Sequence, residues 1–349
     1  MKGSNYTTYL QGLMLIILGT GLFTSGLLFI VGAPPLEAYY HLLKGSLGSW
    51  AKLGHLLRVW IPLTLSACGL LYAFRVGLWN IGVEGQIIMG AVFSTGILRS
   101  GITSDMPGIL LPAAFLAGIA GGALWALLAG YLKTKGGVHE IFSGLGLNFV
   151  AQAMVLWLIF GPWKRPGIAS MSGTEILPQH LWLTTFSALR LSPAGLSATF
   201  AAIVISAFLF RFTRIGLSLD AIGKNRNAAR TLGLNPEYYF LLAMLFAGGF
   251  AGLAGTIQVT GVYHRLIPSI SSNYGYLALL VVMLADYKLW PVPLIAFLFA
   301  CLNVGSIQLP MALQVDSSLS GIIQGALVLT TLAVLGWRQK RNRLEELWN

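Results

Sequence analysis

Nine or ten stretches of this chain are long and apolar enough to cross a lipid bilayer, with almost no charge inside them. A membrane-spanning helix needs about 20 mostly apolar residues. The eighth stretch is the shortest and carries Asp286 at its end, so we expect a partial or tilted helix there. The pattern predicts an all-α polytopic membrane protein of about ten transmembrane helices. The predicted spans are 12–32, 59–75, 86–103, 108–132, 141–161, 194–211, 239–263, 275–287, 290–309 and 319–336.

The composition fits lipid as the surrounding solvent. Hydrophobic residues make up 56% of the chain and charged residues only 9%, whereas a soluble domain carries about 25% charged residues. Spans on this scale leave only loops in a chain of 349 residues. We therefore expect a single transmembrane domain over 1–349 and no soluble catalytic domain. Cys68 and Cys301 both lie in apolar runs, which predicts small hydrophobes rather than a disulfide or a metal pair.

Lysine and arginine positions predict the orientation. The first apolar stretch is longer than a signal-peptide core and is followed by Pro34 and Pro35, so we expect a retained first span. An N-terminus inside places the two densest basic clusters, 211–230 and 338–343, in the cytoplasm, as the positive-inside rule favours. An even number of spans places the C-terminus inside too. The net charge of +11 is spread over loops without a dense basic face, so no nucleic acid partner is expected.

Residues 73–91 interrupt the apolar pattern. Asn80, Glu84 and Gln86 stand among three glycines, with almost no true loop between the flanking spans. One interpretation is a discontinuous helix near 76–86 that lines a pathway, because non-helical backbone at membrane depth must be buried in protein or line a wet cavity. A buried Glu84 would then need Arg75 or a helix N-terminus as its partner. The other interpretation is a short cytoplasmic turn with Glu84 in water.

Other polar side chains inside the spans are rare, and each is a candidate for a substrate pathway. Their alternative role is hydrogen bonding between helices, which contributes about 0.6 kcal/mol on average. Glycines four residues apart, at 118 and 122 and at 248 and 252, predict close helix packing and identify no function. The predicted pathway residues are Trp79, Asn80, Glu84, Gln86, Asn148, Gln152 and Asn303.

The longest predicted cytoplasmic segment is 212–238. A helix is expected from Leu217 to Leu232, with Gly233 as its C-cap and Pro236 just beyond. By its residues alone, this segment is either a docking site for a partner or a basic loop that sets the topology. The chain contains no G-x-x-x-x-G-K-[ST], so we expect it to bind no ATP in a P-loop.

Five segments resemble inner-membrane permeases of bacterial ABC importers, in the simple-sugar and nucleoside branch of the branched-chain amino acid/sugar permease family. The resemblance covers roughly 58–336, and the N-I-G-x-E-G-Q turn is its most specific part. The segments are GLWNIGVEGQIIMGA (77–91), EIFSGLGLNFVAQ (140–152), IGKNRNAARTLGL (222–234), FAGGFAGLAGTIQVTG (246–261) and LSGIIQGALVLTTLAVLG (319–336).

The resemblance implies a permease subunit that carries a nucleoside or simple sugar into the cytoplasm across the bacterial inner membrane. It implies three partners: an ATPase subunit that uses the ATP, a second permease chain and an extracytoplasmic substrate-binding lipoprotein. No cofactor is expected on this chain. In the resembling family, 212–238 docks on the ATPase, which makes the coupling residues Asp220, Gly223, Asn225, Arg226, Ala228, Ala229, Arg230 and Gly233.

Three other functions compete with this one. An ion-coupled secondary transporter of a small polar solute would need several carboxylates inside the membrane, and only Glu84 is a candidate. A membrane-embedded enzyme would need a catalytic motif, and the chain contains neither HExxH nor GxSxG, so we do not expect an enzyme. A membrane scaffold without transport activity is the third.

Overall fold

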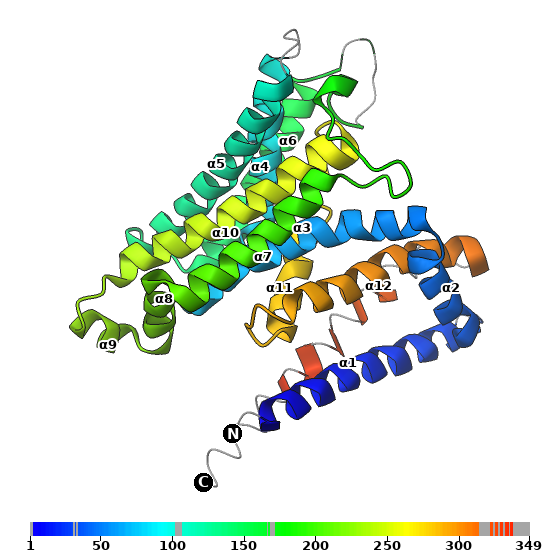
Figure 1. The fold of residues 1–349 in the computed structure, drawn as a ribbon, viewed down its shortest axis with the longest axis horizontal. Coiled ribbons are helices and arrows are strands. Elements are labelled where there is room, and N and C mark those ends of the chain that lie inside the picture. The colour runs from blue at the N-terminus through cyan, green and yellow to red at the C-terminus, as the bar shows by residue number, and fades with distance from the viewer. Residues whose placement is uncertain are drawn as a thin grey trace. The chain divides into compact units, whose positions relative to one another are not determined.

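The structure, a computed structural model, describes residues 3–30, 32, 34–101, 107–165, 167 and 172–313, with several residues between 322 and 337. In this part of the chain the regular structure is entirely helical apart from one isolated bridge between Phe186 and Leu191 (Figure 1). The helices are α1 (Gly3–Ile30), α2 (Pro35–Leu47), α3 (Trp50–Arg75), α4 (Val83–Ser100), α5 (Pro107–Thr134), α6 (Glu140–Phe160), η1 (Gln179–Leu181), α7 (Pro193–Phe212), α8 (Arg214–Lys224), α9 (Arg226–Thr231), α10 (Pro236–Gln258), η2 (Val259–Tyr263), α11 (Tyr274–Leu284) and α12 (Val292–Leu313).

Six of these helices are each long and apolar enough to cross a membrane: α3, α5, α6, α7, α10 with η2, and α12. A seventh is reached if Leu18–Ile30 and Pro35–Leu47, which are bent by 117° at their junction, form one span. The chain is therefore a multi-pass membrane protein. Ten spans and the orientation of the termini stay predictions, and 319–336 lies largely outside the described residues.

The predicted spans leave 33–58 as a connection between 32 and 59, but most of this stretch is helical. This stretch contains α2 and the first two turns of α3. Pro35 stands in the first turn of α2, where its missing N–H costs nothing. Ala38, Leu42 and Gly45 are buried on one face at the spacing of an amphipathic helix. The spacing of Ala38, Leu42 and Gly45 is therefore the helix signal in this stretch, and it does not depend on a long apolar run.

The chain divides into two compact units, and each has its own core. One unit comprises 1–57 with 297–349, and its core cluster contains Leu28, Ala38, Leu42, Leu309 and Ile323. The other unit comprises 58–296 and contains two further core clusters. The predicted pathway and coupling residues all lie in this larger unit except Asn303.

Glycines hold α4, α5 and α10 close together in the larger unit, where the three helices run side by side (Figure 1). A Cβ added to Gly122 would lie 2.6 Å from the Cα of Gly252. A Cβ added to Gly248 would lie 2.5 Å from the Cβ of Ala126. No side chain fits at either contact, so the close packing predicted from the glycine spacing is confirmed.

Candidate functional site

The predicted interruption between the second and third spans is present as non-helical backbone at 76–82, between the end of α3 and the start of α4. Gly77 makes the turn with a φ of +77°, a conformation that glycine adopts freely. The side-chain amides of Asn80 and Gln86 are buried and bond to each other in both directions, at 3.1 and 2.9 Å. Asn80 of the break is therefore buried and paired with Gln86 of α4, whereas Gly77 and Trp79 of the break are exposed.

Glu84 lies in the first turn of α4 and is only 5% exposed. Its carboxylate accepts a hydrogen bond of 2.8 Å from the backbone N–H of Gly275, in the first turn of α11. Of the two partners left open by the sequence, the helix N-terminus is the one used, since its partial positive charge stabilises a carboxylate.

Arg75, the other candidate partner of Glu84, pairs with Asp220 instead. One guanidinium nitrogen lies 2.8 and 2.9 Å from the two carboxylate oxygens of Asp220. The guanidinium also lies over the ring of Phe210, 3.8 Å from its centroid. This pair joins the end of α3 to α8, the first helix of the predicted coupling segment.

Asn148 of α6 connects three elements at the start of α4. Its Oδ1 accepts a hydrogen bond of 2.8 Å from the backbone N–H of Gly85. Its Nδ2 donates to the carbonyl of Ile81 at 2.9 Å and to the hydroxyl of Tyr276 at 3.2 Å. The backbone N–H of Gly85 has no partner inside its own helix, because it lies in the first turn of α4. Asn148 therefore holds the 76–82 break, α4 and α11 together.

A second non-helical segment, 264–273, leads into α11, whose start bonds to Glu84. It begins after the π-helical turn η2 with His264 and ends with Ser272 and Asn273, all three in the left-handed conformation. Gln152 of α6 donates a hydrogen bond of 2.8 Å to the carbonyl of Pro268. The predicted eighth span, 275–287, is helical from its start to Leu284 as part of α11, a helix of 11 residues, and Asp286 and Tyr287 follow it in the left-handed conformation.

The sequence interpretation missed Gly275 and Tyr276, at the start of α11, which bond to Glu84 and Asn148. The signal was the run Pro-Ser-Ile-Ser-Ser-Asn from 268 to 273, placed just before an apolar stretch too short to be a full span. Small polar residues with proline favour turns over helix.

Trp79 and Asn303 do not join this set of contacts. Trp79 is partly exposed and packs edge-to-face against Phe74, with ring centroids 5.4 Å apart. Asn303 lies half-buried on α12 in the smaller unit, where its backbone carbonyl accepts a hydrogen bond from Ser306. The other five predicted pathway residues, Asn80, Glu84, Gln86, Asn148 and Gln152, each form side-chain hydrogen bonds within the chain.

The predicted single helix over Leu217–Leu232 is two helices, α8 and α9, which is a correction. Asn225 separates them with an extended φ of −155°. Its side-chain oxygen accepts hydrogen bonds from the backbone N–H groups of Asn227 and Ala228, so it caps the start of α9. Gly233 follows the end of α9 with a φ of +82°, as its predicted place as a C-cap requires.

The predicted coupling residues divide between the core and the surface. Asp220 is bound to Arg75, and Ala229, only 2% exposed, belongs to a core cluster with Leu219 and Ile222. A Cβ on Gly223 would overlap the backbone carbonyl oxygen of Arg75, so this position requires glycine.

The outward surface of α8 and α9 is both basic and apolar. Asn225, Ala228 and Arg230 are exposed, as is Arg226, whose guanidinium lies 4.4 Å from the ring centroid of Phe240. The sequence interpretation did not include Leu217 and Leu232, which are 72% and 79% exposed. We call this surface, formed by Leu217, Arg226, Ala228, Arg230 and Leu232, the basic-apolar patch.

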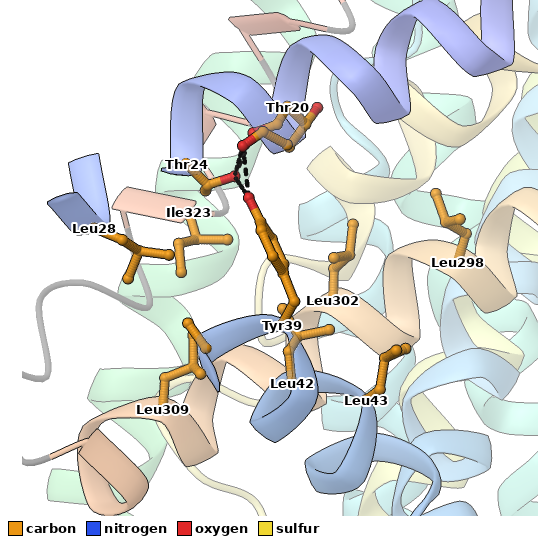
Figure 2. Close-up of a pocket in the computed structure, with 12 residues that line it drawn as sticks. Thr20, Thr24, Leu28, Tyr39, Leu42, Leu43, Leu298, Leu302, Leu309 and Ile323 are labelled. Carbon is orange, nitrogen blue, oxygen red and sulfur yellow. Dashed lines mark hydrogen bonds between the residues drawn. The ribbon is translucent and has the colours of Figure 1, made fainter. Parts of the chain in front are cut away.

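A separate pocket of about 340 Å³ lies within the smaller unit (Figure 2). The hydroxyl of Tyr39 lies 3.1 Å from that of Thr24 and 2.9 Å from that of Ser25. The hydroxyls at this end are therefore bonded to one another, and the other walls are aliphatic, which gives a sugar or nucleoside few partners. Its lining residues are Thr20, Gly21, Thr24, Leu28, Ala38, Tyr39, Leu42, Leu43, Leu298, Leu302, Leu309 and Ile323.

Within the described part of the chain, no three His, Cys, Asp or Glu side chains gather in a way that could hold a metal ion. Cys68 is buried, and Cys301 is partly buried.

A family model described as "Branched-chain amino acid transport system / permease component" matches residues 53–332. A glucose ABC transporter permease protein of Haloferax volcanii is 30% identical, over 86% of this chain and 81% of its own length. A guanosine ABC transporter permease protein of Bacillus subtilis is 29% identical, over 90% and 91%. A nucleoside ABC transporter permease protein of Lactococcus lactis is 26% identical, over 79% and 78%.

Among solved structures, PsaBC from Streptococcus pneumoniae in complex with Fab matches 81% of this chain and 89% of its own, at 14% identity and a TM-score of 0.40. That similarity is too low to support an argument about fold or function.

Proposed function

Because this chain belongs to the branched-chain amino acid transport system / permease component family, we propose that it is the permease subunit of an ABC importer for a nucleoside or a simple sugar. Relatives named for glucose, guanosine and nucleoside transport support this substrate class. On this proposal the chain is a conduit in the bacterial inner membrane, and ATP is bound and hydrolysed by a partner subunit.

The basic-apolar patch is the observation that carries the coupling part of the proposal. Exposed apolar side chains on the same helices as exposed arginines are typical of a surface that another protein covers. Leu217 and Leu232 supply the apolar contacts, and Arg226 and Arg230 supply the charge. Behind the patch, the Arg75–Asp220 pair connects α8 to α3. If a partner bound to the patch moves α8, the Arg75–Asp220 pair would transmit that movement to the end of α3, next to the 76–82 break.

Two further partners follow from the same proposal. A second permease chain, identical or homologous, would complete the pathway, and a substrate-binding lipoprotein would deliver the solute from outside. Alternating access then requires that the ATPase bind the two permease conformations with different affinities, because only a difference in affinity shifts such an equilibrium.

The test is uptake of labelled guanosine and labelled glucose by cells that make the complete importer. We expect uptake of one of them to continue when a protonophore collapses the proton gradient and to stop when ATP is depleted. Uptake that stops with the protonophore while ATP is maintained would instead favour the ion-coupled secondary transporter. The position of Glu84 argues against that rival, because its carboxylate already accepts a hydrogen bond from the backbone N–H of Gly275.

A further inference from the structure

The three hydroxyl groups that line the pocket of the smaller unit are all bonded within the chain. Tyr39 reaches from α2 toward Thr20 and Thr24 of α1 (Figure 2). The hydroxyl of Tyr39 donates to the carbonyl of Gly21 at 2.5 Å, and that of Thr24 donates to the carbonyl of Thr20. The hydroxyl of Thr20 lies 2.6 Å from that of Thr330. A ligand of this pocket is therefore recognised by the other walls.

Those other walls are aliphatic, with six leucines and Ile323 among the lining residues. The volume of about 340 Å³ falls within the range of about 300–1,000 Å³ that is typical of small-molecule sites. A cavity with aliphatic walls stays free of water and takes up apolar molecules. If it were empty, the side chains that line it would lose dispersion contacts on that side. The pocket therefore suits a hydrocarbon chain.

Leu43 connects the pocket to the outside of the molecule, because it lines the pocket and is 56% exposed. It belongs to a row of exposed apolar side chains on one face of α2, which also contains Leu36, Tyr40 and Leu47. This helix is bent by 117° from the segment Leu18–Ile30, so its axis is closer to perpendicular than to parallel with that segment. An amphipathic helix that leaves a spanning helix in this way lies along the membrane surface, with its apolar face in the lipid.

Two lysines stand beside this opening. Lys44 follows Leu43 in the last turn of α2, and its Nζ lies 5.3 Å from the ring centroid of Tyr40. The Nζ of Lys52 donates to the backbone carbonyl of Lys44 at 3.0 Å, which brings the second ammonium group to the same place. Glu37 is the only side-chain carboxylate among the described residues of the smaller unit, and it lies about 10 Å before Lys44 along the helix. The charge beside the opening is therefore positive and favours an anionic group.

We propose that the smaller unit binds one phospholipid of the surrounding bilayer, with an acyl chain in the pocket and an anionic head group at Lys44 and Lys52. The aliphatic walls bind the chain, and the two lysines select the head group. A single lipid molecule reaches both parts, because Leu43 at the opening and Lys44 are adjacent residues. The inference goes beyond the proposed function and does not depend on it, since it requires only a membrane around the chain.

The experiment is native mass spectrometry of the purified full chain, titrated with phosphatidylglycerol or with phosphatidylcholine that carries the same acyl chains. We expect one phosphatidylglycerol to bind at least about fivefold more tightly than phosphatidylcholine, because lysines near the membrane surface attract anionic lipids. Lys44→Glu should reduce this preference to less than about twofold. The matched control is Lys164→Glu, at an exposed lysine outside the smaller unit, which should keep the wild-type preference.

A second variant, Leu302→Trp, tests the pocket itself. Its larger side chain would take the space of the acyl chain, so it should weaken the binding of both lipids at least about tenfold. The control Leu294→Trp changes a leucine on α12 that is 67% exposed and does not line the pocket, and it should leave both affinities unchanged.

Gel filtration of each variant shows whether it is folded, and Lys44→Glu at the surface keeps the test decisive if Leu302→Trp aggregates. Equal affinities of the wild-type chain for the two lipids would overturn the inference. Wild-type lipid binding in a folded Leu302→Trp chain would overturn it too. If that variant also recovered less of the partner permease, the pocket would be a protein contact instead of a lipid site.

Discussion

Replacing Asn148 by leucine tests whether the contacts around Glu84 hold the fold together at the two helix breaks. The change keeps the size of the side chain and removes its hydrogen bonds to Gly85, Ile81 and Tyr276. At an average of about 0.6 kcal/mol for each interhelical hydrogen bond in a membrane, the three bonds amount to roughly 2 kcal/mol.

The loss should exceed that average, because the backbone N–H of Gly85 would stay buried without a partner. An unsatisfied buried donor costs about 1–3 kcal/mol. We therefore expect Asn148→Leu to lower the free energy of unfolding by about 2–4 kcal/mol. The measurement is unfolding of the purified chain in mixed micelles as the denaturing detergent is increased, followed by fluorescence of its ten tryptophans.

Asn303→Leu is the matched control, since no hydrogen bond joins the Asn303 side chain to any described residue. It should change the free energy of unfolding by less than about 0.5 kcal/mol. Tyr276→Phe should cost less than Asn148→Leu, and it should cost nothing when Asn148 is already leucine, because the shared bond is then absent. Equal losses in the Asn148 and Asn303 variants would refute the reasoning.

Three further predictions concern packing, the carboxylate and the patch. Gly252→Ala should lower the unfolding free energy by about 1–3 kcal/mol, because the added Cβ would overlap the carbonyl oxygen of Gly118. The control Gly249→Ala, whose Cβ would meet only Ile119 at 3.5 Å, should leave the unfolding free energy unchanged. Equal effects of the two substitutions would contradict the packing. Glu84→Ala should abolish uptake, and Glu84→Gln should retain part of it, because an amide oxygen still accepts from Gly275; wild-type uptake in Glu84→Ala would contradict this role. Leu232→Glu should reduce the amount of ATPase subunit that co-purifies with the permease at least about threefold. The control Leu36→Glu, at a leucine that is 84% exposed on α2, should not reduce it. Unchanged recovery in Leu232→Glu would contradict docking of the ATPase on the patch.

Local signals predicted the parts of the site that depend on short-range chemistry. Glycine and polar residues between two apolar runs indicated the break at 76–82, and the glycine spacing indicated close helix packing, which the structure places between α5 and α10. Gly233 has the positive φ expected of a C-cap. The split between α8 and α9 was also within reach, because asparagine is a strong N-cap residue and Asn225 stands at the break.

The partners across the fold were beyond the reach of one sequence. Glu84 bonds to Gly275, 191 positions further along the chain, and nothing local distinguishes that helix start from Arg75. The burial of Ala229 likewise depends on which face of α9 meets the core. For Asn80, Gln86 and Asn148, the sequence left open either a place in the pathway or a structural hydrogen bond. The structure shows that all three side chains form hydrogen bonds within the chain.

The central claim, that this chain is a conduit without an energy source of its own, is tested most directly by reconstitution. The purified chain is placed in liposomes with and without its ATPase, partner permease and binding protein, and accumulation of guanosine and glucose is measured with ATP supplied on the ATPase side. We predict that one of these solutes accumulates above the external concentration only when the partners and ATP are both present. Accumulation against a gradient by the chain alone would contradict the account.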